Sequence, residues 1–397
     1  MAIPRYQPIA GPAVLSAGFR PFFLLGALWG ATAIPLWLMV YGGSSALPTA
    51  LDPTVWHVHE MVFGYGAAIV AGFLLTAIAN WTGRPPLQGG PLAALVLLWA
   101  IGRAAVLLSA WIGASGAALL DLAFPAVFLG VVAREILAGR NWRNLPMLVA
   151  LTLLLLGNLL VHLEALGLAA TAAAGNRLGV ATLLMLISFV GGRIIPSFTR
   201  NWLAKIRPDA SEPSPFGVLD RLALSLTGLA LVLWVAQPDE APANWAAFAA
   251  GLALGIRLLR WQGRATLREP LVWILHLGYG WLALGFLLQA VNGFVPLLPP
   301  TTALHALTVG GIGTMTLAMM TRVSLGHTGR PLTADAATVA IYSAVTLAAL
   351  LRLLAPLGGS QYLLLLSLAG AAWSGAFGLF ILFYFRPLTR PRVKPAK

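Results

Sequence analysis

Long apolar runs recur along the whole chain, and short polar turns separate them. A helix that crosses the hydrocarbon core of a bilayer needs about 20 predominantly apolar residues. Runs of that length predict about twelve spans, at residues 17–42, 54–80, 91–112, 117–138, 145–167, 177–198, 217–236, 244–262, 268–292, 301–323, 333–356 and 361–385. We therefore expect an all-α, polytopic membrane protein, with residues 1–397 forming one transmembrane domain in the lipid bilayer.

The composition excludes a water-soluble fold. Charged residues make up 9% of the 397 positions and hydrophobic residues 59%, whereas about 25% of an ordinary globular protein is charged. The chain also has no cysteine, which removes thiolate ligands and covalent c-type haem attachment. A metal site must therefore use histidine, methionine, tyrosine, carboxylate or backbone ligands.

The basic residues are distributed unevenly between the loops. If the N-terminus is cytoplasmic and the spans alternate, all 25 Lys and Arg residues except Arg103, Arg177 and Arg352 fall in inner loops or at inner helix ends, Arg257 among them. Such a bias predicts cytoplasmic N- and C-termini. It also accounts for the net charge of +13 without nucleic acid, because no basic cluster alternates with exposed aromatic residues.

Several charged residues fall inside the predicted spans. Charges at membrane depth are costly unless they are paired, and they are functional candidates by default. Arg103 and Arg352 are the basic candidates, and we expect each to pair with a buried carboxylate or with a porphyrin propionate. Glu60 and Asp121 are acidic residues with similar placement.

Five of the six histidines lie within spans. His57, His59, His162 and His305 come from three spans and share one depth, in the outer half of the membrane, whereas His276 is deeper. Four histidines at one level favour a metal or haem site over packed core residues, so these five are the candidate metal ligands. His57 and His59 point about 200° apart on a helix. They therefore serve two neighbouring centres, or His57 supports the site of His59 by hydrogen-bonding a haem propionate.

An internal repeat relates the second predicted span to the tenth. His59, Gly64 and Thr82 each have the same residue type 246 positions later, and Thr82 begins a Thr-Gly-Arg-Pro run that recurs there. We therefore expect diverged copies of a four-helix unit, at about residues 17–140, 145–262 and 268–390. Such repeats place functional sites at their interface in many membrane proteins.

The repeat makes His59 equivalent to His305. Two imidazoles on two helices suit the axial positions of one b-type haem, with His57 as the main competitor to His59. Gly64 and Gly310 would leave room for the flat macrocycle, although small residues also serve close helix packing. Arg103 and Arg352 are the candidates to neutralise its propionates.

Five segments of the chain resemble the NnrS family: residues 18–23 (GFRPFF), 56–61 (WHVHEM), 80–85 (NWTGRP), 191–196 (GGRIIP) and 305–330. The resemblance covers essentially the whole chain. Members of this family are bacterial inner-membrane proteins that are associated with haem and copper and occur with denitrification and nitric-oxide stress systems. The resemblance therefore implies haem b, a second haem or copper as a further cofactor, and chemistry or protection involving nitric oxide.

These features lead to two main hypotheses of function. The first is a haem-containing oxidoreductase, a nitric oxide reductase, in which Glu60 relays protons and His57 with His162 forms or adjoins a second metal or haem site. Its electrons would come from quinol or a periplasmic donor. The second is a non-catalytic haem or copper carrier or sensor. A secondary transporter is a third reading, and it would need polar groups near the membrane midplane.

Overall fold

The computed structural model describes residues 11–206, 212–295 and 298–393, and within these ranges it contains helices and turns but no strand. Among the described residues, 12 helical segments are long and apolar enough to cross a membrane. The spans are Phe19–Tyr41, Pro53–Thr82, Gly89–Leu107, Ala114–Ala138, Trp142–Ala165, Ala172–Ile206, Val218–Ala236, Ala241–Leu259, Pro270–Phe294, Pro300–His327, Ala336–Leu357 and Gly359–Thr389. The predicted all-α, polytopic fold is confirmed.

Local sequence explains where the second span begins and ends. Pro53 opens it, where a missing N–H does no harm, and the Asp52 side chain accepts a hydrogen bond from Thr54 N at 2.8 Å. Gly83 ends the span with a φ of +70°, a conformation that glycine adopts without strain. Gly329 has a φ of +76° in the second Thr-Gly-Arg-Pro run, so the repeated motif stops a helix in both places.

The chain folds into two compact units. Unit 1 comprises Met1–Gly179, Val323–Pro331 and Phe380–Lys397, and unit 2 comprises Val180–Arg322 and Leu332–Leu379. This division does not follow the three predicted repeats, which remain a prediction.

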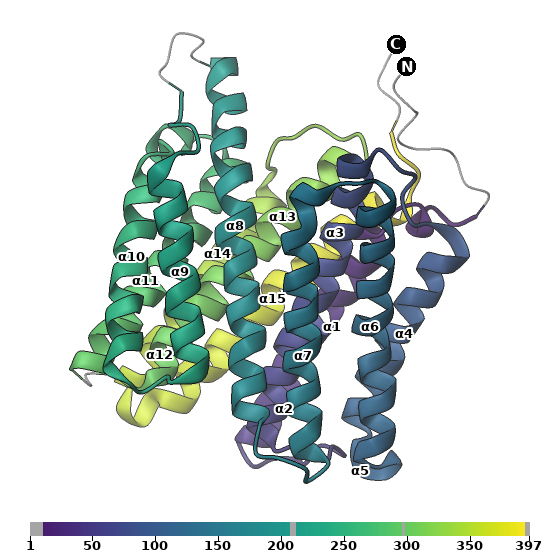
Figure 1. Cartoon of the computed structure of the whole chain (residues 1–397), viewed down its shortest axis with the longest axis vertical. Helices are drawn as coiled ribbons and strands as arrows, with labels where there is room; N and C mark the ends of the chain where they lie inside the picture. The colour runs from purple at the N-terminus through teal and green to yellow at the C-terminus, as the bar shows by residue number, and fades with distance from the viewer. Residues whose placement is uncertain (1–10, 207–211, 296–297, 394–397) are drawn as a thin grey trace. The chain divides into compact units, whose positions relative to one another are not determined.

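Unit 1 contains all of the first five spans. Its elements are α1 (Phe19–Tyr41), α2 (Pro53–His59), η2 (Glu60–Gly66), α3 (Ala67–Thr82), α4 (Gly89–Leu107), α5 (Ser109–Ile112), α6 (Ala114–Ala138) and α7 (Leu145–Ala165). Helix α6 packs against both α4 and α7, and α1 packs against η2 and α3 (Figure 1). Together with the contacts of α2 on α1 and α7, they bring the ends of α2, α4 and α7 and the beginning of α6 together.

Unit 2 contains α9 (Val218–Ala236), α10 (Ala241–Leu259), α11 (Pro270–Phe294), α12 (Pro300–His305), η5 (Ala306–Gly313) and α14 (Ala336–Leu354). Helix α10 packs against α9 and α11, and η5 packs against α11 and α14. The boundary between the units falls within α8 (Ala172–Ile206) and α15 (Tyr362–Thr389), and it separates α13 (Thr314–His327) into two parts.

Two spans are interrupted by π-helical segments, η2 and η5. His59 is the residue directly before η2, and His305 is the residue directly before η5. The π-helix is rare and often lies at functional sites. Its occurrence at both repeat-related histidines supports the relation between these two spans.

Candidate functional site

Unit 1 contains a group of buried polar side chains, which we call the polar cluster. Its members are His59, Glu60, Arg103, Asp121, Asn158 and His162. Each residue is at most 3% exposed, so water does not solvate these groups. Charges in such surroundings must be paired within the protein, and the cluster consists largely of such pairs.

The change from α2 to η2 places two adjacent side chains in the cluster. His59 ends α2 and Glu60 begins η2. A turn closed by i→i+5 hydrogen bonds is wider than an α-helical turn, so successive side chains rotate less around the axis. His59 Nδ1 and Glu60 Oε1 consequently lie 3.1 Å apart.

Arg103 connects the two carboxylates of the cluster. Its Nη1 donates to both oxygens of Glu60, at 2.8 and 2.7 Å, and its Nη2 donates to Asp121 Oδ1. Trp29 on α1 also donates to Glu60, with Nε1 and Oε2 2.6 Å apart. Of the two partners expected for Arg103, the structure shows protein carboxylates, and pairing with a propionate stays a prediction.

Both ring nitrogens of His59 face oxygen atoms. Nδ1 faces Glu60, while Nε2 lies 2.8 Å from Asn158 Oδ1 and 3.2 Å from Asp121 Oδ2. A neutral imidazole has one N–H and one lone pair. The ring therefore carries a second proton, a facing carboxyl group is protonated, or one ring nitrogen binds a group that is not a hydrogen-bond acceptor.

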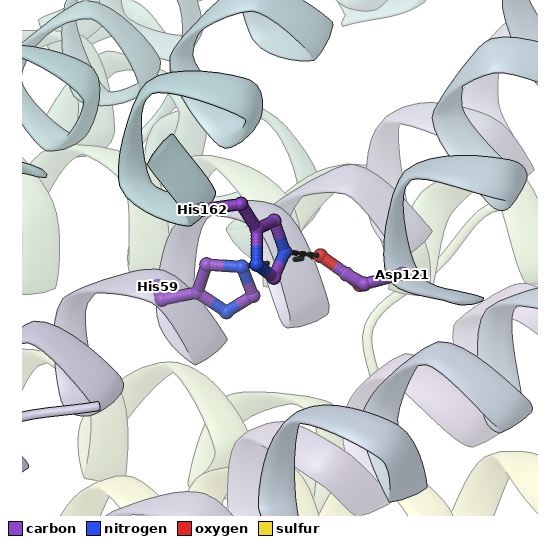
Figure 2. Close-up of side chains that lie close together, drawn as sticks. All are labelled: His59, Asp121 and His162. Carbon is purple, nitrogen blue, oxygen red and sulfur yellow. Dashed lines mark hydrogen bonds and ion pairs between the residues drawn. The ribbon is translucent and has the colours of Figure 1, made fainter. Parts of the chain in front are cut away.

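His59, Asp121 and His162 converge on one point (Figure 2). His162 Nε2 lies 2.9 Å from Asp121 Oδ2, and one ligand atom from each of the three residues lies within 4.8 Å of the others. Asn158, one turn before His162 on α7, donates to the same Asp121 oxygen at 2.8 Å. Two imidazoles and one carboxylate are a donor set that suits zinc, copper or iron.

Gly64 leaves the space that the paired charges fill. A Cβ at this position would lie 2.7 Å from Glu60 Oε2, 2.9 Å from Arg103 Nη1 and 3.0 Å from Trp29 Nε1. The sequence alone suggests that this glycine makes room for a haem. In the structure it makes room for the Glu60–Arg103 pair, and its carbonyl accepts a hydrogen bond from Trp99 at 3.0 Å.

His57 lies outside these contacts. Its half-buried ring stacks on Trp37, with the ring centroids 4.3 Å apart, so it points away from His59 as the helical spacing predicts. The grouping predicted for His57, with His162 and Glu60, differs from the observed one. In the structure His162 contacts Asp121, and Glu60 contacts His59.

The remaining predicted histidines belong to unit 2. His305 Nδ1 donates to the carbonyl of Thr301 at 2.6 Å, which leaves the lone pair of a neutral ring on Nε2. His276 Nε2 lies 2.9 Å from the Thr199 hydroxyl. Because His59 and His305 are in different units, their pairing around one haem stays a prediction.

The positions in unit 2 that correspond to the charged pair are apolar. Ala306 and Ala349 stand 246 residues after Glu60 and Arg103, and both belong to one buried hydrophobic group with Trp281. The Trp281 ring also lies against Gly310, where a Cβ would be 2.6 Å from Cδ2. The sequence repeat relates Arg352 to Arg103. Arg352 is buried on α14, about one turn after Ala349.

Unit 2 has its own buried ion pair, which the sequence did not predict. Arg257 is 0% exposed, although its place near a helix end suggests a solvated inner residue. Its Nε donates to Asp220 Oδ1 at 2.8 Å, and its Nη1 donates to the Ser188 carbonyl and to the Tyr279 hydroxyl. These contacts tie α8, α9, α10 and α11 together, which is a structural role.

Sequence reasoning missed Asn158 and did not place Asp121 in the site with the histidines. The sequence marks Asp121 as an intramembrane acid but not as a partner of the histidines. Asn158 lies four residues before His162, and this i,i+4 spacing on one helical face is the signal that points to it.

The sequence profile of the NnrS family, described as NnrS protein, matches residues 13–392, nearly the whole chain. The chain belongs to the NnrS family. No individual protein of curated function matches it. All six residues of the polar cluster lie within the part of this NnrS protein that the profile matches.

The surroundings of His59 do not fit the haem that was expected there. Its ring is fully buried and both nitrogens have oxygen partners. The space beside Gly64 is filled by Glu60, Arg103 and Trp29. A single ion needs far less room than a macrocycle, and the converging donor atoms of this NnrS protein suit an ion better.

Proposed function

We propose that this NnrS protein acts on nitric oxide in the bacterial inner membrane, and that the polar cluster is its reactive centre. Membership of the NnrS family supports the link to nitric oxide. The observation that carries the choice of site is the fully buried set of acid and base groups that links Glu60, His59 and Asp121 at membrane depth.

The groups of the cluster suit a reaction that consumes protons. Joining two nitric oxide molecules to form nitrous oxide and water takes up two electrons and two protons. Glu60, His59 and Asp121 hold one another within hydrogen-bonding distance, so a proton on one group has a neighbour that accepts it. Arg103 pairs with both carboxylates, and its single positive charge compensates one of their two negative charges.

The proposed electron source is quinol or a periplasmic donor. With the N- and C-termini in the cytoplasm, the cluster lies in the outer half of the membrane, because His59 is about two turns from the beginning of its span. Nitric oxide is small and apolar, so it reaches this depth through the lipid.

The test is nitric oxide consumption by anaerobic membrane vesicles that contain the full-length protein and are supplied with a quinol. We expect Asp121→Asn to lower the rate by at least about 100-fold, because positioned acid–base groups contribute that much. His327→Gln is the matched control in unit 1, since this ring packs at a tilt against Phe19, with centroids 5.6 Å apart, and takes no part in the cluster.

Equal rates in the wild type, in Asp121→Asn and in vesicles without the protein would overturn the catalytic proposal. Protection of cells against nitric oxide without consumption would favour the carrier or sensor reading. Haem content, measured on the same preparations as the pyridine haemochrome, tests separately whether haem b is bound by the chain.

A further inference from the structure

We propose that His59, Asp121 and His162 bind one divalent first-row transition-metal ion. The proposal deepens the proposed function, on which it rests for the reaction that the ion serves. Binding of the ion itself rests only on the geometry of unit 1. The three ligands come from α2, α6 and α7, so the ion would hold three helices at one point.

The donor atoms are spaced as ligands of one ion. Bonds of about 2.0 Å at tetrahedral angles place neighbouring ligand atoms about 3.3 Å apart. Asp121 Oδ2 lies 3.2 Å from His59 Nε2 and 2.9 Å from His162 Nε2. Small movements of these side chains therefore bring all three atoms to bonding distance of a common centre.

A second layer of contacts already orients the ligands. A metal-binding histidine usually donates its other ring N–H to a carboxylate or carbonyl, which fixes the tautomer and makes the ring a better ligand. His59 Nδ1 faces Glu60 Oε1 at 3.1 Å, and Arg103 and Trp29 hold that carboxylate in turn. The Nε2 atom that remains for the ion is the one that faces Asp121.

The charges of the cluster also call for a cation. Glu60 and Asp121 are opposed by the single guanidinium of Arg103, and the two imidazoles add no charge when neutral. One negative charge is then uncompensated in a fully buried site, which is costly. A divalent ion removes the deficit and leaves one positive charge, which an anionic fourth ligand would neutralise.

A fourth oxygen stands beside the three ligands. Asn158 Oδ1 lies 2.8 Å from His59 Nε2, and its Nδ2 donates to Asp121. This amide either joins the coordination sphere or moves aside for an exogenous ligand. A site with three protein ligands and one exchangeable position is the usual arrangement of catalytic metal centres.

The competing reading is a network without metal, in which His59 carries a second proton. The two readings differ in the metal content of the full-length protein, purified in detergent from cells grown with added iron, copper or zinc salts. We expect about one ion per polypeptide in the wild type and in His327→Gln, and a loss of at least about tenfold in His162→Gln and Asp121→Asn. Glu60→Gln, which keeps all three ligands, should weaken binding by about 10- to 100-fold.

A spectroscopic variant keeps the test decisive if a ligand replacement does not fold. The chain has no cysteine, so His162→Cys introduces a single thiol. In protein from cobalt-supplemented cells, a thiolate-to-cobalt charge-transfer band is expected in this variant and not in the wild type, because a thiolate at position 162 would bind the ion.

Two results would overturn the metal site: a wild type with no ion from any of these media, or ligand variants with undiminished metal content. These measurements do not involve nitric oxide. A bound ion in a protein that leaves nitric oxide unchanged would refute the function and keep the site. Nitric oxide consumption by a metal-free protein would refute the metal site and keep the proposed function.

Discussion

Arg103 determines whether the polar cluster is stable, because it is the positive group that lies between Glu60 and Asp121. Its planar guanidinium binds one carboxylate with Nη1 and the other with Nη2. Lysine has a point charge and cannot match this fork geometry. At the scale of single residues, the cluster is therefore a set of interdependent charges, and removing one member leaves the others unpaired.

Replacing Arg103 with Ala should lower the free energy of unfolding by about 3–5 kcal/mol, because two buried carboxylates lose their counter-charge. The matched control is Arg134→Ala. The Arg134 side chain is 64% exposed in its pair with Glu135, and such pairs contribute about 0–1 kcal/mol. Thermal unfolding in detergent, with the intermediate Arg103→Lys variant alongside, measures the difference. If Arg103→Ala and Arg134→Ala lower the free energy of unfolding equally, the buried ion pair contributes no more stability than the exposed one.

Gly64→Ala should also destabilise unit 1. Its methyl group would approach Glu60 and Arg103 closer than 3.0 Å, and overpacking of this kind costs about 1–3 kcal/mol. Gly130→Ala on α6 is the control, since nothing lies within 4 Å of its Cβ position. The apparent melting temperature should fall for the first variant only. An unchanged value for Gly64→Ala would mean that the charged pair can shift to admit the methyl group.

At the scale of secondary structure, the π-helical segment η2 is the element that shapes the site. A π turn contains one residue more than an α turn. The extra residue lets His59 and Glu60 face the same cluster while the rest of the span continues as a regular helix, α3. The same interruption follows His305, but the residue after that histidine is Ala306, so no charge enters there.

Deleting Met61 should convert this π turn into an α turn and leave α3 in register. We expect the protein to fold, with Glu60 rotated out of the cluster and with loss of nitric oxide consumption. Val70 lies in the regular part of α3, where no turn has an extra residue that a deletion could remove. Its deletion therefore rotates the rest of the helix by about 100°. Far-UV circular dichroism and melting temperature should show the greater damage for Val70. The reverse order would refute this account of η2.

For the whole molecule, the two units differ in the chemistry of their repeat-related positions. Unit 1 has Glu60 and Arg103 where unit 2 has Ala306 and Ala349. Unit 2 instead buries Arg257 with Asp220. Divergence of this kind fits the proposal of one reactive centre per chain, in unit 1. The corresponding residues of unit 2 pack in its hydrophobic core.

The position of that centre relative to the membrane depends on the orientation of the chain. The one-sided distribution of Lys and Arg predicts cytoplasmic termini. A reporter fused after Lys397 should therefore be active in its cytoplasmic form and silent in its periplasmic form. The opposite result would place the polar cluster in the inner half of the membrane and exclude direct access for a periplasmic donor.

The sequence by itself determined the all-α fold, the number of spans and the presence of histidines and charges at membrane depth. Hydropathy over about 20 residues is a local property, and a backbone in lipid must satisfy its own hydrogen bonds, so these features follow without tertiary information.

Only the tertiary structure decided which of those groups meet. Asp121 and His162 are 41 residues apart in the chain and join because α6 packs against α7. The separation of His57 from His59 already follows from helical spacing, but Glu60 joins His59 because a wide turn begins there. The place of a π turn and the packing of one helix against another decide which side chains meet, and residue spacing in a single span specifies neither.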